Sequence, residues 1–168
     1  SRGQERMNRD KTELRIRQEL ETMVQNRVIC GFSLAFVRPK RAELLYHGMM
    51  GSIAPYDSRP VKSGLYYDLA SLSKVVGTAS RVLQLAESGE LSLNMPVSLL
   101  LPRYSGNAAT IGQLLLHTSG LPAEIPDKYH LTRDNFYDRL YNTAPVAKPG
   151  EQMIYSDVGY ILLGLILQ

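Results

Sequence analysis

The segment over residues 68–78 places a serine and a lysine at the start of a helix that has an apolar face. Apolar residues recur along it at helical spacing, which predicts a helix over 71–87. They are Leu72, Val75, Val76, Ala79, Val82, Leu83 and Ala86. Ser71 and Lys74 are three positions apart, so their side chains lie on one face of that helix, one turn from each other.

This spacing suits an activated serine. A serine hydroxyl is a weak nucleophile until a neighbouring group takes its proton, and a lysine can do so if its surroundings keep a fraction of it neutral. The first turn of a helix also favours the negative charge that develops during attack. The pair Ser71 and Lys74 therefore indicates nucleophilic catalysis, with a helix cap followed by a solvated lysine as the alternative.

The composition limits the other classes of function. With 168 residues, 44% of them hydrophobic, the chain can form one domain with a sizeable core. Its net charge of +3 is dispersed, which argues against a nucleic-acid partner. No apolar run approaches the ~20 residues of a membrane span. The single cysteine, Cys30, and the lack of metal-ligand spacings or nucleotide fingerprints predict no disulfide, metal or cofactor.

The first third of the chain predicts one helix and two strands. An amphipathic helix is expected over 10–26, with Asp10 and Glu13 as a capping box. Strands are expected over 28–37 and 42–50, with Phe32, Leu34 and Phe36 on one face. They form a hairpin, which a loop over 51–64 follows.

The remainder predicts short helices separated by loops. Thr110 is expected to cap a helix through Leu115, and Thr132 or Asp134 a helix over 131–142. Residues 90–102 are predicted to be a connector, and the last helix to cover 158–168. That helix stops within an apolar pattern, and a lone hairpin is only marginally stable in water. We therefore expect the chain to form part of a larger fold.

Five segments in a fixed order carry a family resemblance: 71–74, 89–102, 110–122, 149–151 and 155–164. Together they resemble the serine β-lactamase-like family, which includes class C β-lactamases, low-molecular-weight penicillin-binding proteins, D-Ala-D-Ala carboxypeptidases and esterases. The resemblance extends from about Val28 to the last residue. It implies an α+β fold of the β-lactamase/transpeptidase type, with the C-terminal strands missing.

On this resemblance the chain is a single incomplete domain over 1–168. It comprises an N-terminal arm and helix (1–27), a hairpin and loop (28–64) and a helical region (65–168). The remaining strands are expected in a companion chain or a removed segment. Without them one oxyanion donor is absent, which costs about 10²–10³ in rate, so the chain alone should be a poor catalyst.

The resemblance also implies the site residues. The family's nucleophile corresponds to Ser71, its activating lysine to Lys74 and the tyrosine of its second motif to Tyr155. Asp157 stands where asparagine is commoner, and it should favour a charged Lys74. The alternative role for Asp157 is the N-cap of the last helix. Ser73 is either a supporting hydroxyl or a surface residue.

The implied activity is acyl transfer through an acyl-enzyme at Ser71, on amides or esters such as a D-Ala-D-Ala peptide, a β-lactam or a small ester. A lipolytic or promiscuous esterase and a truncated, non-catalytic fragment are the alternatives.

The family is often extracytoplasmic, although no signal peptide opens this chain. His117 is assigned to a structural turn, His47 and His130 to surface or strand positions, and a Ser-His-Asp triad stays open.

Overall fold

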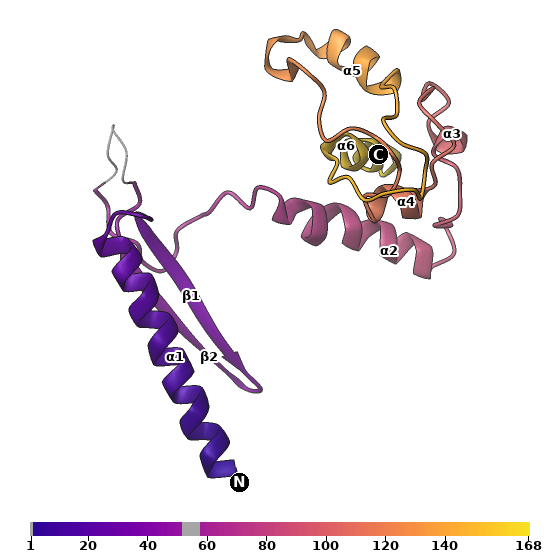
Figure 1. The fold of residues 1–168 in the computed structure, drawn as a ribbon. Helices are drawn as coiled ribbons and strands as arrows, with labels where there is room; N and C mark the ends of the chain where they lie inside the picture. Colours follow the sequence, from indigo (N-terminus) through magenta and orange to yellow (C-terminus); the bar gives the residue numbers. More distant parts are fainter. Residues whose placement is uncertain (1, 52–57) are drawn as a thin grey trace. The chain divides into compact units, whose positions relative to one another are not determined.

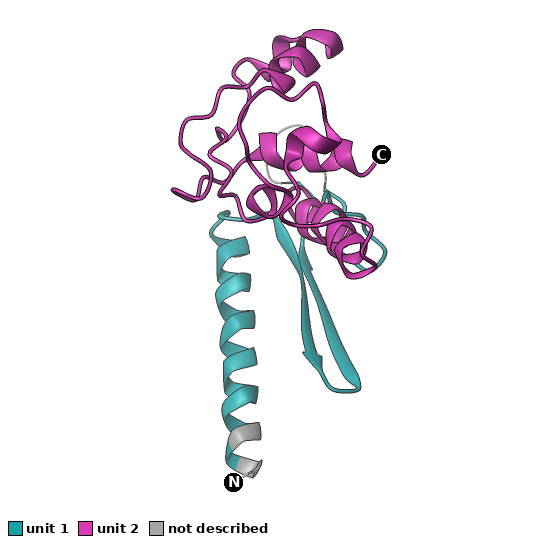
Figure 2. Cartoon of the chain, turned by 90° about the vertical axis from the view of Figure 1, so that its right-hand side faces the viewer, with its two compact units in different colours: residues 1–68 teal, residues 69–168 magenta. Residues whose placement is uncertain are grey.

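The computed structural model describes residues 2–51 and 58–168, so the middle of the predicted loop over 51–64 lies outside the described residues. The chain divides into two compact units, residues 1–68 and residues 69–168 (Figure 2). Each unit is described by itself below. The division of one incomplete domain at residues 27 and 64 stays a prediction.

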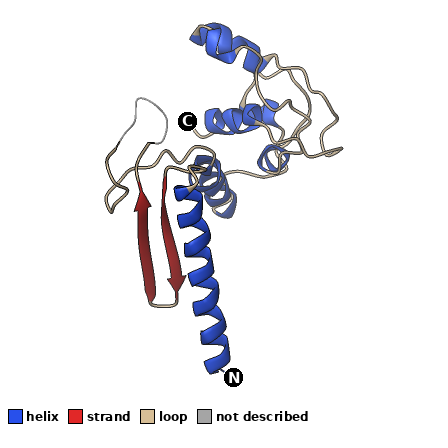
Figure 3. Ribbon diagram, turned by 60° about the vertical axis from the view of Figure 1, so that its left-hand side comes forward, coloured by secondary structure: helices blue, strands red, loops and turns tan. Residues whose placement is uncertain are grey.

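The first unit consists of a long helix and a hairpin. Helix α1 covers Arg2–Gln25, and strands β1 (Gly31–Arg38) and β2 (Arg41–Gly48) pair antiparallel. Residues Gly31 and Gly48 face each other at one end of the register and Arg38 and Arg41 at the other. The helix lies alongside the hairpin (Figures 1 and 3). The predicted hairpin is therefore confirmed.

The predicted start of the first helix is wrong. Helix α1 begins at Arg2, so Asp10 lies within it and cannot cap it. The carboxylate of Glu13 is bound instead to the guanidinium of Arg38 on β1. Asp10 and Glu13 have the spacing of a capping box, but charged residues at this spacing also occur inside a helix.

Strand β1 shows the predicted alternation, since Phe32, Leu34 and Phe36 are each less exposed than the residues between them. It begins three residues later than predicted, at Gly31. The reason is that the Val28 amide donates to the Met23 carbonyl at 2.9 Å, which closes the end of α1. Residues 26–28 therefore belong to the helix terminus.

The second unit is helical. Its elements are η1 (Lys74–Ala79), α2 (Ser80–Glu87), α3 (Val97–Leu100), α4 (Ile111–Leu115), η2 (Lys128–His130), α5 (Arg133–Tyr141) and α6 (Asp157–Ile166). The predicted helix over 71–87 is present, but its first part, η1, is a π-helix. The connector predicted over 90–102 contains the short helix α3. No described helix is both long and apolar enough to cross a membrane.

The apolar stripe predicted for η1 and α2 is only partly buried. Val82 is fully buried, whereas Leu72, Val75 and Val76 are all more than half exposed. Leu83, which lies in the regular helix α2, is also more than half exposed, so much of the stripe lies off the inward face. Within the second unit that inward face carries Lys74 as well as Val82.

Apolar side chains from several helices form the core of the second unit. They are Val82, Leu91, Val97, Tyr104, Ile111, Leu114, Leu121, Ile125, Leu140, Val158, Leu162 and Leu163. Thr110 caps α4 in a capping box with Gln113, and Thr132 caps α5, as predicted. Helices α4 and α6 pack against each other, and α6 also contacts η1. This packing brings the first residues of α6 to the start of η1.

Candidate active site

Ser71 lies in the turn that leads into η1. Ala70 has a left-handed backbone with a φ of 44°, and the Lys74 amide donates to the Ser71 carbonyl at 3.1 Å. The Lys74 ammonium is 3.4 Å from the Ser71 hydroxyl oxygen. A lysine that donates to this oxygen leaves the hydroxyl proton free to point to another acceptor.

Residues 155–157 are fixed by the start of α6. The hydroxyl of Ser156 accepts a hydrogen bond from the Gly159 amide at 3.1 Å and donates to the Pro122 carbonyl at 2.7 Å. The Asp157 amide donates to the Ala123 carbonyl at 2.7 Å. The side chains before and after Ser156 therefore occupy defined positions.

Asp157 binds Lys74 and does not cap α6. Its Oδ1 is 2.8 Å from the Lys74 Nζ, and the lysine side chain is only 17% exposed. Ser156 is the N-cap, because its backbone is extended and its hydroxyl accepts from Gly159. The N-cap hypothesis for Asp157 is therefore wrong, and the alternative, a contact with Lys74, is what the structure shows.

This ion pair determines the protonation of Lys74. Its hydrogen bond to the Asp157 carboxylate raises the pKa of Lys74, and this outweighs burial, which acts in the opposite direction. Lys74 therefore carries its charge at neutral pH. A lysine held in this form is a poor acceptor for the proton of Ser71, as the aspartate at this position led us to expect.

Tyr155 completes the cluster. The Lys74 Nζ lies 5.0 Å from the centre of its ring. Hydrogen bonding to Ser71, and then to Lys74, lowers the pKa of the Tyr155 phenol. The side chain is about half exposed, so a ligand can reach it. The phenol is therefore shifted toward its deprotonated form, the form in which it can accept a proton.

A second lysine near Asp157 was missed by the sequence analysis. The Lys128 Nζ is 2.8 Å from a Glu124 carboxylate oxygen and 3.8 Å from Asp157 Oδ2. The one local signal for this pair is the spacing of four residues between Glu124 and Lys128, although the segment before Lys128 is a loop and not a helix. The sequence does not predict that this pair lies beside Asp157, because the contact between Lys128 and Asp157 arises from tertiary structure and not from their spacing along the chain.

His117 lies in the turn that follows α4, as predicted, with a φ of 58°. Its Nδ1 accepts a hydrogen bond from the Ser156 amide at 2.9 Å. This nitrogen is therefore occupied and cannot take the proton of a serine. Burial lowers the pKa of His117, and the charge of Lys74 adds to the effect. Imidazole with Nδ1 as acceptor is neutral and carries its proton on Nε2.

Ser73 is not brought into the cluster. Its side chain is exposed, and within the described part of the chain it has no hydrogen-bond partner. Of its two proposed roles, the surface hydroxyl fits this position. His47, on β2, and His130, at the end of η2, are also exposed.

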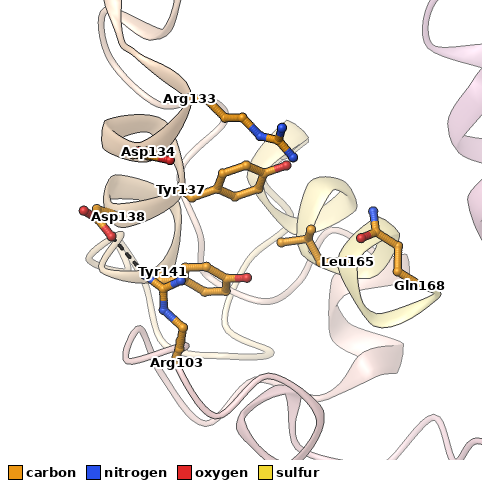
Figure 4. A pocket seen from close by; sticks show the side chains of 8 residues that line it. All are labelled: Arg103, Arg133, Asp134, Tyr137, Asp138, Tyr141, Leu165 and Gln168. Atoms are coloured by element: carbon orange, nitrogen blue, oxygen red, sulfur yellow. Dashed lines mark hydrogen bonds and ion pairs between the residues drawn. The ribbon is translucent and has the colours of Figure 1, made fainter.

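The second unit also contains a cavity of about 430 Å³, which lies between α5 and α6 (Figure 4). Tyr137 and Tyr141 extend from α5 toward Leu165, and Arg103 is bound to Asp138 at its edge. This cavity is not lined by any of the four residues of the cluster, which are Ser71, Lys74, Tyr155 and Asp157. Over residues 2–51 and 58–168 the structure contains no group of three side chains suited to hold a metal ion.

Replacing Asp157 with asparagine is expected to lower the pKa of Lys74. The amide has the same shape as the carboxylate but lacks the charge that stabilises the ammonium. An NMR titration of the lysine side-chain signals measures this pKa. Glu124→Gln is the matched control, because it removes a carboxylate from Lys128 instead. An unchanged pKa of Lys74 in Asp157→Asn would contradict the assignment.

The fold and this cluster define the class of the protein: a β-lactamase/transpeptidase-like fold, combining helices with a two-stranded antiparallel sheet. The model of the Beta-lactamase family matches residues 16–168. The chain therefore belongs to the Beta-lactamase family, which confirms the fold and the resemblance expected from its motifs.

Two curated relatives show how much of such a protein this chain represents. It is 33% identical over 135 residues to Penicillin-binding protein 4* of Bacillus subtilis (strain 168), covering 75% of this chain and 30% of that protein. It is 37% identical over 115 residues to Protein flp of Staphylococcus aureus (strain MRSA252), covering 61% of this chain and 22% of that protein. The chain thus spans less than a third of these relatives.

Solved structures of related proteins likewise match this chain over only part of their length. A class C β-lactamase in complex with cefoxitin matches with a TM-score of 0.77 and 25% identity, over 94% of this chain and 45% of that one. A β-lactamase/D-alanine carboxypeptidase from Pseudomonas syringae matches with a TM-score of 0.75 and 25% identity, over 90% of this chain and 42% of that one. The matched part makes up less than half of each of these two chains.

Proposed function

We propose that this chain carries the nucleophile and the proton-transfer groups of a serine hydrolase that works through an acyl-enzyme. One observation carries the proposal: Ser71 lies within 3.4 Å of the Lys74 ammonium and is hydrogen-bonded to a tyrosine whose pKa is lowered. Nucleophilic catalysis by a serine requires a neighbouring group that can accept the proton of its hydroxyl.

In this proposal Tyr155, as phenolate, accepts the proton of the Ser71 hydroxyl while Oγ attacks the substrate carbonyl carbon. The charged Lys74 stabilises the phenolate and is not itself the base. Tyr155 then gives the proton to the leaving amine or alcohol as the carbonyl–heteroatom bond breaks, which leaves an ester at Ser71. In the second half water gives a proton to Tyr155 and attacks the carbonyl carbon of this ester. The bond from that carbon to Ser71 Oγ then breaks, Tyr155 returns the proton to Oγ, and the carboxylic acid leaves.

The substrates proposed are amides or esters, namely a D-Ala-D-Ala peptide, a β-lactam or a small ester. The relative that is a penicillin-binding protein and the structural neighbour that is a β-lactamase/D-alanine carboxypeptidase support this range. Because the chain covers 30% of that relative and 42% of that neighbour, turnover is proposed for the protein in which the remaining strands are also present.

Intact mass spectrometry of the purified chain, with a fluorophosphonate or a penicillin, tests the proposal. We expect a single adduct of each probe that maps to Ser71. An adduct with the fluorophosphonate but not with penicillin, together with hydrolysis of short p-nitrophenyl esters, would favour the esterase alternative. Absence of any adduct at Ser71 would contradict the proposal and favour a non-catalytic fragment.

The same spectra test the expected companion chain. If a second polypeptide completes the sheet, it should copurify and appear as a second mass in stoichiometric amount. Labelling of Ser71 should then be faster in the complex, because a complete oxyanion hole is worth about 10²–10³ in rate.

A further inference from the structure

His117 occupies a backbone position that usually belongs to glycine. The amides of His117 and Thr118 donate to the carbonyls of Leu114 and Gln113, at 3.2 and 2.9 Å. This is the Schellman ending of a helix, in which the left-handed residue is most often glycine. A side chain with a Cβ is sterically unfavourable in this conformation. The imidazole therefore calls for an explanation beyond the turn itself.

Hydrogen bonds from His117 hold the chain on both sides of Tyr155. The His117 carbonyl accepts from the Ile154 amide at 2.8 Å, and its Nδ1 accepts from the Ser156 amide at 2.9 Å. One residue of the turn thus fixes the backbone before and after Tyr155. A glycine could supply the first of these bonds but not the second.

The imidazole also contacts the ring of Tyr155. The centres of the two rings are 4.5 Å apart. The imidazole also stacks on the ring of Tyr160 with the ring centres 4.9 Å apart, and the Tyr160 hydroxyl donates to the Leu115 carbonyl at 3.1 Å. The imidazole therefore contacts two tyrosine rings, one of them the ring of Tyr155.

We propose that neutral His117 is the positioning residue that holds Tyr155 against Ser71 and Lys74, and that protonation of His117 releases it. Protonated Nδ1 would present a hydrogen to the Ser156 amide, so the bond between them would be lost. The inference rests on the function proposed for Tyr155, but it concerns the placement of the phenol and can be tested without turnover.

The groups around the imidazole are Lys74, Asp157, Tyr155 and Tyr160. Lys74 opposes a second positive charge and Asp157 favours it, while burial favours the neutral form. Because the balance lowers the pKa of His117, the proposed release occurs only below the ordinary range of histidine. Tyr155 should therefore keep its placement at neutral pH and lose it on acidification.

Two substitutions separate the imidazole from the turn. In His117→Gly the left-handed backbone is relieved and the bond to Ile154 is kept, so a purely structural residue would be replaced without harm. In His117→Asn the side-chain oxygen takes the place of Nδ1 on the same carbon, and asparagine tolerates the left-handed conformation. His47→Asn, at an exposed histidine of β2, is the control.

The measurement is an NMR titration with ¹³Cζ-tyrosine and ¹⁵N-histidine. In the unsubstituted chain we expect an unprotonated Nδ1 and a protonated Nε2 at His117, and a Tyr155 signal that moves as His117 titrates. In His117→Gly the pKa of Tyr155 should rise toward that of an ordinary tyrosine. In His117→Asn that pKa should stay low and the acid-dependent change should disappear.

A protonated Nδ1 in the unsubstituted chain, or an unchanged pKa of Tyr155 in His117→Gly, would overturn the inference. The first of these results needs no variant, so the test survives if a substitution prevents folding. If Ser71 takes up no probe but Tyr155 titrates as expected, the proposed function fails and the positioning role stands.

Discussion

Replacing Ser71 with alanine is expected to abolish the covalent adduct with fluorophosphonate and penicillin, because Ser71 is the nucleophile proposed for both probes. In a protein that also contains the remaining strands, hydrolysis should fall by about 10³-fold or more, leaving what substrate binding and the oxyanion donors supply. The fold should be retained, since the Ser71 carbonyl that accepts from the Lys74 amide is unchanged. Intact mass and initial rates measure the two effects.

Ser73→Ala is the matched control for this prediction. Ser73 lies two residues away, belongs to the same helical start and has an exposed side chain. Its removal should leave labelling and hydrolysis within about twofold of the parent chain, as is usual for a surface substitution. A Ser71→Ala variant that is still labelled, or a Ser73→Ala variant that is not, would move the nucleophile away from Ser71.

Periodicity and turn residues predicted most of the helices and strands. Phe32, Leu34 and Phe36 alternate as a half-buried strand must, and Thr110 and Thr132 cap helices for a local reason that the sequence contains. The failures are at places where a local pattern competes with a non-local one. Asp10 and Glu13 resemble a capping box, but they lie inside α1, and Glu13 binds Arg38 on β1 instead.

The candidate site was predictable as far as the motifs extend. Ser71 and Lys74 are close in sequence, so helical geometry alone places them together. That Tyr155 lies close to Ser71 was predicted only from the family resemblance, because the contact forms only when α6 packs on η1. The contact of Lys128 with Asp157 could not be predicted, since it depends on the path of the loop around Ala123.

Replacing Tyr155 with phenylalanine is the sharpest test of which group takes the proton. The substitution removes one oxygen atom and keeps the ring that lies against His117. If the phenolate is the base, acylation of Ser71 should slow by about 10²–10⁴, the usual contribution of a general base. Lys74 would remain charged by Asp157 and could not replace it.

The rate of labelling as a function of pH distinguishes the two possible bases. The pKa of Tyr155 is lowered, so the rate in the parent chain should rise with pH and level off before the ordinary range of tyrosine. The pKa of Lys74 is raised, so a lysine base would make the rate rise only at more alkaline pH.

Tyr129→Phe controls for the loss of a phenol beneath a lysine, because the Lys128 Nζ lies 5.2 Å from the ring centre of Tyr129. This variant should keep the parent rate and its pH dependence. A Tyr155→Phe variant that also kept both would assign the base to Lys74, despite its ion pair. The aspartate at position 157 would then have to release Lys74 when substrate binds, because a lysine can accept a proton only after losing its own.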